Sequence, residues 1–333
     1  MGVTWMAPRA EPADDGLPHV DYGPQLNIVF WLLCVLSGIF LGLRVYCKVY
    51  RGRKMWWDDY VLIASWVAFL ISAATTSRCV TLGYGLNAYD MPKGTNMSYI
   101  AVYAGFFSVL SAAWSKTSFG LTMLRLCTGW VKWFIWFIII TVNAILGVAM
   151  LLMWVKCQPF NKIWEPEVEG KCIDGKIIVY FYQWSAGWSG SADIILALLP
   201  WTILFNMRPA LNVKERLGVA VAMSMGIVAG AASFVKMVML PKLTGDPAET
   251  VAVTIWGGTE GTLTIIAASI PVLRALVSDV KKSLSASKQF NTLDERHLNT
   301  TRQGGTRRGT RGDKDGMNIY VSKDVYIHGA YSA

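Results

Sequence analysis

The sequence is poor in charge, because Asp, Glu, Lys and Arg together make up only 16% of its 333 residues. Soluble globular domains typically carry about 25%, so this composition excludes an ordinary soluble protein. The motifs HExxH, GxSxG and the P-loop are missing, which excludes the enzyme classes that they define. The six cysteines show neither CxxC nor Cys/His ligand spacing, so we expect no metal site and no cofactor.

Hydrophobic residues are abundant instead, at 53% of the chain with a mean hydropathy of +0.38. This composition predicts a polytopic membrane protein, embedded in the lipid bilayer of the plasma membrane or an endomembrane. The net charge of +9 fits basic residues gathered in cytosolic loops and tails, where anionic lipid attracts them. No motif for reading or stacking on bases accompanies this charge, so we predict no nucleic-acid partner.

Apolar segments of membrane-spanning length recur along the chain and predict an all-α, seven-helix transmembrane bundle. The predicted spans are residues 26–43, 60–81, 99–125, 133–155, 177–205, 217–240 and 251–273. They lie in a membrane domain of residues 25–277, which follows a polar tail, residues 1–24, predicted to be disordered. Residues 278–333 form a basic tail rich in Ser, Thr and Gly, a candidate site for a cytosolic protein partner.

The charge of the loops predicts the orientation of the chain. Five basic residues and no acid follow the first predicted span: Arg44, Lys48, Arg51, Arg53 and Lys54. By the positive-inside rule this loop is cytosolic, which places the amino terminus outside and, after seven spans, the carboxyl terminus in the cytosol.

Two residue pairs near the predicted membrane surfaces have structural interpretations. Asp58 and Asp59 open the second span, where carboxylates satisfy free backbone N–H groups, so we interpret them as a helix cap rather than a functional site. Cys157 and Cys172 bracket a polar loop on the non-cytosolic side and are candidates for a disulfide in an oxidising compartment.

A buried polar centre is predicted from three charged residues on three spans. Lys116 lies roughly 13 Å from Arg125 along a helix, close to the middle of a hydrocarbon layer about 30 Å thick. Asp193 and Glu260 lie at similar depth on other spans. Because exposing such groups to lipid is costly, Lys116 should face the protein interior and pair with one of the two acids.

Two interpretations of this centre stay open. The acid left without a partner would be neutral near pH 7, and would relay protons or donate a hydrogen bond to a ligand. Alternatively, the three groups only fix helix packing. Lys236 lies about one turn from the outer end of its span, so we interpret it as snorkelling to the interface.

Known seven-span signatures are missing. A microbial retinal photoreceptor needs a lysine in its last span, and the seventh predicted span has none. The third span ends in Leu124-Arg125-Leu126 rather than Asp/Glu-Arg-Tyr, and the seventh lacks Asn-Pro-x-x-Tyr, so the signatures of hormone-type receptors are absent.

An ordered series of motifs runs through about residues 25–280. Its first half comprises Arg44, Trp57-Asp58-Asp59-Tyr60, Gly83-Tyr84-Gly85, Lys116-Thr117-Ser118 and Leu124-Arg125-Leu126. Its second half comprises Cys157-Gln158-Pro159-Phe160, Trp164, Cys172, Asp193, Leu199-Pro200, Glu260 and Ala268-Ser269-Ile270-Pro271-Val272-Leu273-Arg274. This series resembles the fungal rhodopsin-domain integral membrane proteins.

The resemblance implies a seven-helix membrane protein of the kind often encoded among secondary-metabolite genes, with some relatives regarded as surface receptors. Despite the family's name, its members are not known as retinal proteins. The chain departs from the family where Leu86, Asn87 and Ala88 replace a histidine-containing loop, and where Lys236 replaces an arginine. The second departure argues against bidentate anion binding in the sixth span.

These features predict a protein accessory to secondary-metabolite biosynthesis, which binds, senses or moves a small hydrophobic molecule in the bundle. One alternative is a receptor-like surface sensor that signals through its cytosolic loops. Another is an intramembrane isomerase or cyclase that uses a buried carboxylic acid. The sequence leaves enzymatic activity undecided and favours a role without it.

Overall fold

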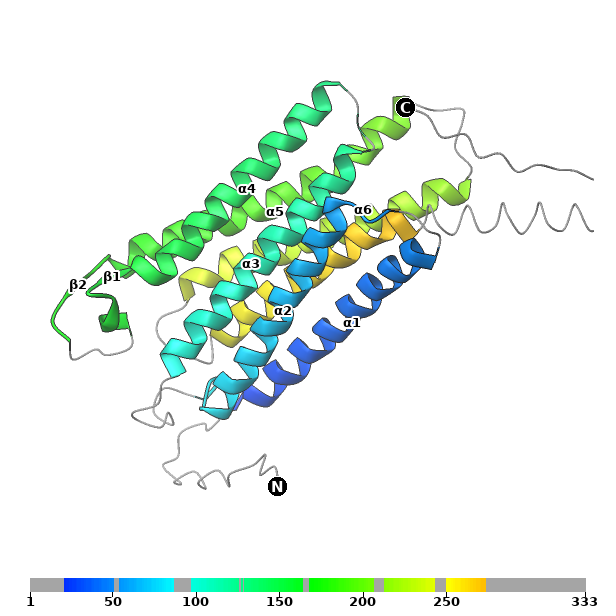
Figure 1. Cartoon of the computed structure of the whole chain (residues 1–333). Helices are drawn as coiled ribbons and strands as arrows, with labels where there is room; N and C mark the ends of the chain where they lie inside the picture. The colour runs from blue at the N-terminus through cyan, green and yellow to red at the C-terminus, as the bar shows by residue number, and fades with distance from the viewer. Residues whose placement is uncertain are drawn as a thin grey trace, which may run out of the picture. The chain divides into compact units, whose positions relative to one another are not determined.

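The computed structural model describes residues 21–50, 54–86, 97–125, 127, 129–163, 168–206, 213–242 and 250–273. These residues are almost entirely helical (Figure 1). The seven long helices are α1 (Gly23–Tyr50), α2 (Trp57–Thr81), α3 (Met97–Leu124), α4 (Trp130–Val155), α5 (Gly175–Asn206), α6 (Val213–Met239) and a final unlabelled helix, Thr250–Leu273. We call the last of these the final helix. The predicted carboxy-terminal tail and most of the predicted amino-terminal tail lie outside the described residues.

Each predicted span falls on one of these helices, and no span extends beyond its helix by more than one residue. Five helices are long and apolar enough to cross a membrane by length and composition: α1, α2, α3, α4 and the final helix. The chain is therefore a multi-pass membrane protein. Helix α1 runs seven residues beyond the predicted span, to Tyr50, and this extra length carries Arg44 and Lys48.

Helices that follow one another in the chain pack side by side, α1 on α2, α2 on α3, α3 on α4, α4 on α5 and α5 on α6. The closest approach between α5 and α6 depends on glycine. A Cβ at Gly226 would come within 2.6 Å of Ala197 Cβ, and one at Gly230 within 2.6 Å of Ile194 Cγ1. The Gly-x-x-x-Gly spacing of Gly226 and Gly230 predicts a close contact between helices, and the two glycines make such a contact with α5.

A short hairpin follows α4. Strands β1 (Cys157–Gln158) and β2 (Lys171–Cys172) pair antiparallel, with the 3₁₀ turn η1 (Phe160–Ile163) between them, and a second such turn, η2 (Leu240–Lys242), ends α6. Cys157 and Cys172 are joined by a disulfide. We call the end of the bundle that carries this disulfide the disulfide end, and the opposite end, where Arg44 lies, the basic end.

The apolar core lies between the helices along the length of the bundle. Toward the basic end it includes the fully buried side chains of Leu62, Phe119, Ile135, Leu196 and Ile265. A second cluster, toward the disulfide end, joins α1, α2 and the final helix through Leu26, Phe30, Phe69, Ala73 and Val251. Two groups of polar side chains and one cavity interrupt this core, and together they form the candidate site.

Candidate functional site

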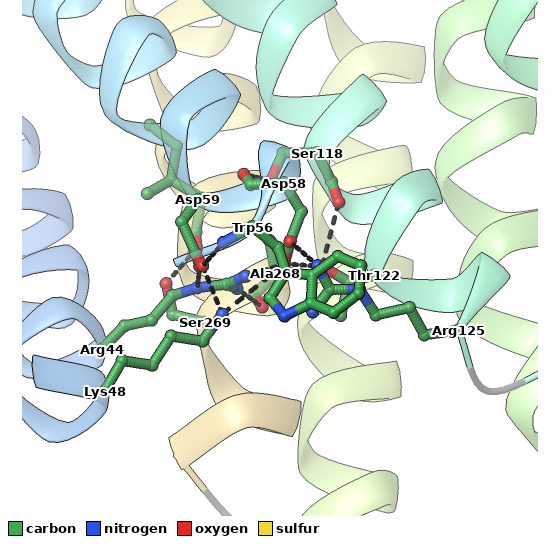
Figure 2. Close-up of polar contacts among 11 residues, drawn as sticks. Arg44, Lys48, Trp56, Asp58, Asp59, Ser118, Thr122, Arg125, Ala268 and Ser269 are labelled. Carbon is green, nitrogen blue, oxygen red and sulfur yellow. Dashed lines mark hydrogen bonds and ion pairs between the residues drawn. The ribbon is translucent and has the colours of Figure 1, made fainter. Parts of the chain in front are cut away.

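The first polar group, which we call the basic-end cluster, is centred on Arg44 (Figure 2). The Arg44 side chain is fully buried and joins three helices. Its Nε lies 2.9 Å from Asp59 Oδ1, its Nη2 lies 2.6 Å from Asp58 Oδ2, and its Nη1 donates to the backbone oxygen of Ala268. The forked guanidinium has enough donors to satisfy all three acceptors at once. A lysine ammonium at the same place would not reach all three.

Two further cations complete this cluster. Lys48, one turn beyond Arg44 on α1, donates to Asp59 Oδ2 and lies 3.8 Å from Asp58 Oδ2. Arg125 pairs with Asp58 Oδ1, and its guanidinium carbon lies 4.5 Å from the centre of the Trp56 ring. The cluster therefore sets three cations against two carboxylates, and the cation–π contact adds a partner for the third.

The acidic pair at the start of α2 has more than the predicted role. The Trp56 N–H donates to Asp59 Oδ2 at 3.2 Å, which is a helix cap. Among the described residues, Asp58 makes no such bond, and both carboxylates are engaged chiefly by Arg44, Lys48 and Arg125. The sequence held a signal for this, because Arg44 and Lys48 are four residues apart and so share a helix face at the same membrane boundary.

The second polar group, which we call the interior network, contains Lys116, Asp193 and Glu260. The Lys116 Nζ donates to Asp193 Oδ2 and lies 3.0 Å from Glu260 Oε1. Ser189 donates to the same Glu260 oxygen at 2.8 Å. The side chains of the three charged residues are at most 2% exposed. The structure thus brings the three predicted residues together from α3, α5 and the final helix.

Lys236 is the fourth member of the interior network. Its Nζ lies 2.6 Å from Glu260 Oε2, so the interpretation of Lys236 as a snorkelling lysine was wrong. The cause is the second oxygen of Glu260, which offers a buried charge partner inside the bundle. Two lysines therefore balance two carboxylates, and the expected acid without a partner was also wrong.

The third feature is a cavity of about 460 Å³ at the disulfide end, a size typical of small-molecule sites. It lies among α2 to α6 and the final helix. Most of its lining is apolar or small, including Ala101, Val102, Gly105, Val109, Leu146, Met153, Ile178 and Gly257. The exposed residue Ser98 also lines it, so the cavity reaches the protein surface.

The cavity has two lysines in its lining, Lys156 and Lys236, and no aspartate or glutamate among the described residues. Lys236 is paired with Glu260, as described above. The Lys156 amine is half-buried and has no hydrogen bond or ion pair to any described residue, and burial lowers the pKa of Lys156. Its backbone oxygen accepts a 2.9 Å hydrogen bond from Ile173 N–H, beside the Cys157–Cys172 disulfide.

The tyrosine of the loop after α2 closes another side of the cavity. Tyr84 OH lies 3.1 Å from Thr254 Oγ1 of the final helix, and burial raises the pKa of Tyr84. Gly85 permits this turn, because its φ is +101° and an added Cβ would lie 2.6 Å from the Gly23 nitrogen. Tyr22 N–H donates to the Gly85 oxygen at 3.1 Å, which ties the loop to the start of α1.

The three features are connected. Lys236 lines the cavity and pairs with Glu260, which in turn contacts Lys116. Two residues after Lys116 on α3, Ser118 donates to the Asp58 backbone oxygen at 2.6 Å, within the basic-end cluster. A chain of polar contacts and one helix thus link the cavity to the opposite end of the bundle.

Comparison with known proteins gives one match. The family model described as the fungal rhodopsin domain matches residues 43–279, which contain the interior network, the cavity lining and nearly all of the bundle. The chain matches no curated protein and no solved structure. Among the described residues, no group of three or more His, Cys, Asp and Glu side chains is arranged to hold a metal ion.

Proposed function

The chain belongs to the fungal rhodopsin domain family, and we propose that it binds a small, mainly apolar molecule in the cavity at the disulfide end and senses its presence. The observation that carries this proposal is that Lys236 belongs both to the cavity lining and to the interior network. A molecule that enters the cavity therefore meets a charged residue whose contacts extend into the bundle. The molecule shifts the equilibrium between two arrangements of the helices only if it binds one arrangement more tightly than the other.

Sensing is favoured over transport by the packing beyond the cavity. The interior network lies beside the cavity, and the buried side chains of Leu62, Phe119, Leu196 and Ile265 fill the bundle toward the basic end. A molecule carried through the bundle would have to separate these contacts and the three ion pairs of the interior network. A sensed molecule needs only to shift them, and the basic-end cluster is placed to pass that shift to a cytosolic partner.

The proposed orientation has the disulfide end outside and the basic end in the cytosol, with all seven helices spanning the membrane. Two observations support it. Basic residues gather at the end that carries Arg44 and Lys48, as cytosolic loops do. The disulfide between Cys157 and Cys172 suits an oxidising compartment, which the other side of the membrane provides.

The family resemblance supplies the proposed class of molecule, a secondary metabolite or its precursor. Metabolite profiling of a deletion strain, with cells and medium measured separately, tests this role. A sensor changes the amount of product made, a transporter leaves product inside the cells, and an enzyme leaves an unconverted intermediate. Unchanged profiles in both fractions would contradict a role in secondary metabolism.

Binding itself is tested by filling the cavity. Gly105 lines the cavity, and a Cβ there would meet its nearest neighbour, Met153, at 3.6 Å, so Gly105→Leu adds volume to the cavity without a backbone clash. Gly147→Leu is the matched control, because Gly147 has no atom within 4 Å of its added Cβ and does not line the cavity. We expect mass spectrometry of protein purified from its native host to find a small molecule retained by wild type and Gly147→Leu. Equal retention by Gly105→Leu would contradict the proposal.

A further inference from the structure

The charges of the cavity restrict what it can hold. Of its two lysines, Lys236 is already neutralised by Glu260, at 2.6 Å. Lys156 has no carboxylate partner among the described residues, and none of them places an acid in the cavity lining. The cavity therefore carries a local excess of one positive charge at the position of Lys156.

Lys156 is held in this position by the hairpin. Its backbone oxygen accepts the hydrogen bond from Ile173 N–H, and the next residue, Cys157, forms the disulfide with Cys172. The half-buried ammonium loses hydration among apolar groups, and no described residue gives it a hydrogen bond or an ion pair in exchange. An anion bound beside it would restore the lost interaction, and hydrogen bonds between charged groups are the stronger class.

The rest of the cavity suits an apolar body. Val102, Val109, Leu146 and Met153 contribute side chains without hydrogen-bonding groups. Several hydroxyl groups of the lining already donate to protein atoms, as Ser72 does to the Ala104 oxygen at 2.8 Å and Thr254 to the Thr250 oxygen at 2.8 Å. These hydroxyl groups are not free to donate to a ligand.

We propose that the ligand is a small amphipathic carboxylic acid, bound with its carboxylate against Lys156 and its apolar body in the cavity. This assignment rests on the proposed function and names the ligand class for the same site. It differs from an anion site at Lys236, because that lysine is occupied by Glu260. It also makes the disulfide hairpin part of the binding site rather than only a stabilising loop.

The test uses three probes of one shape: 1-pyrenebutyric acid, its methyl ester and 1-pyrenebutylamine. Binding to the full-length protein in phosphatidylcholine nanodiscs is measured by equilibrium dialysis, with empty nanodiscs subtracted. We expect the acid to bind at least about tenfold more tightly than the ester, since only the acid forms a hydrogen bond in which both groups are charged. The amine should bind most weakly, because its positive charge is repelled by the Lys156 ammonium.

Variants test whether the tighter binding of the acid, compared with the ester, depends on the Lys156 amine. Lys156→Met should reduce the ratio of acid to ester affinity to about one, and Lys156→Arg should retain most of it. Lys176→Met is the matched control, because Lys176 is exposed at the same end of the bundle and does not line the cavity. The assignment is overturned if Lys156→Met still binds the acid more tightly than the ester. It is also overturned if Lys176→Met loses this difference to the same extent as Lys156→Met.

The remaining outcomes separate this inference from the proposed function. If acid and ester bind wild type equally and both are lost in Gly105→Leu, the cavity binds apolar molecules but the carboxylate assignment is wrong. If Gly105→Leu leaves the binding of every probe unchanged, the probes do not use the cavity and both proposals fail. If phosphatidylserine added to the nanodiscs displaces the acid, the site belongs to an anionic lipid and the assignment to a soluble acid is wrong.

Discussion

Lys236 of α6 lies 2.6 Å from Glu260 of the final helix, and this pair is the boundary between the cavity and the interior network. Without it, the interior would hold two carboxylates against the single amine of Lys116. Charge balance within the bundle therefore depends on a residue that a ligand in the cavity can reach. The stability of the protein and its response to a ligand should be coupled through this residue.

We expect Lys236→Met to lower the free energy of unfolding by about 3 kcal/mol, because it leaves an uncompensated carboxylate in the bundle. Adding Glu260→Gln should recover at least half of this loss, since Lys116 and Asp193 then remain as a balanced pair. SDS titration followed by tryptophan fluorescence measures both. The proposed charge balance would be contradicted if the double variant lost as much unfolding free energy as the two single variants together, or more.

The two arginines of the basic-end cluster should differ in importance. Arg44→Met removes a fully buried partner of Asp58 and Asp59 and should cost about 3–5 kcal/mol. Arg125→Met should cost less than about 1 kcal/mol, because its side chain is 38% exposed and Asp58 keeps Arg44. Arg44→Lys should recover only part of the loss, since one ammonium cannot reproduce the fork. Equal losses at the two positions in the same titration would contradict this ranking.

The helices were predictable because five of them, α1 to α4 and the final helix, have the length and apolarity that a bilayer requires, whatever their neighbours are. The prediction that Lys116 pairs with either Asp193 or Glu260 also followed from depth, since opposite charges at the same depth in the hydrocarbon layer are stabilised by pairing. Depth alone did not predict that Lys236 pairs with Glu260. Its direction depends on how α6 is rotated against the final helix, which the glycine contact with α5 determines.

The basic-end cluster and the cavity were harder to predict for different physical reasons. A carboxylate at a helix start predicts a cap, and Asp59 makes one, but the same residue type also serves an ion pair with Arg44. The choice depends on how α1 and α2 pack together. The cavity is a volume left by side chains from six helices, and no local pattern in the chain encodes it.

The proposed orientation is tested with two introduced cysteines in a background in which Cys47 is replaced by serine. Cys47 is half-buried, whereas Cys34, Cys79 and Cys127 are buried, so the background should react little. We expect an impermeant maleimide to label Lys176→Cys in intact cells, and to label Asn212→Cys, between α5 and α6, only after permeabilisation. Labelling of both sites in intact cells would show that α5 does not cross the membrane.

The stability of the protein should depend on pH through Lys156. Burial lowers its pKa in the folded state below the ordinary value of about 10.4, so at neutral pH the charged amine opposes folding. Lys156→Met should therefore stabilise the protein at pH 7, and the gain should shrink as the pH rises toward about 10.4, where the unfolded chain also loses the proton. Thermal unfolding of both proteins across this pH range measures the gain in stability. Lys176→Met should show no such trend, and a gain independent of pH would exclude a charge effect.

The contact between α5 and α6 gives a prediction that does not depend on charge. Gly230→Ala places a Cβ 2.6 Å from Ile194 Cγ1 and 2.9 Å from the Gly190 oxygen, so the helices must separate, and we expect a loss of about 1–3 kcal/mol. Gly261→Ala is the matched control, because no atom lies within 4 Å of its added Cβ. That change should stabilise the final helix by about 0.5–1 kcal/mol, as alanine is the better helix former. SDS titration of the two variants side by side measures the contrast. If Gly230→Ala were as stable as Gly261→Ala, α5 and α6 would not be in the close contact that places Lys236 against Glu260.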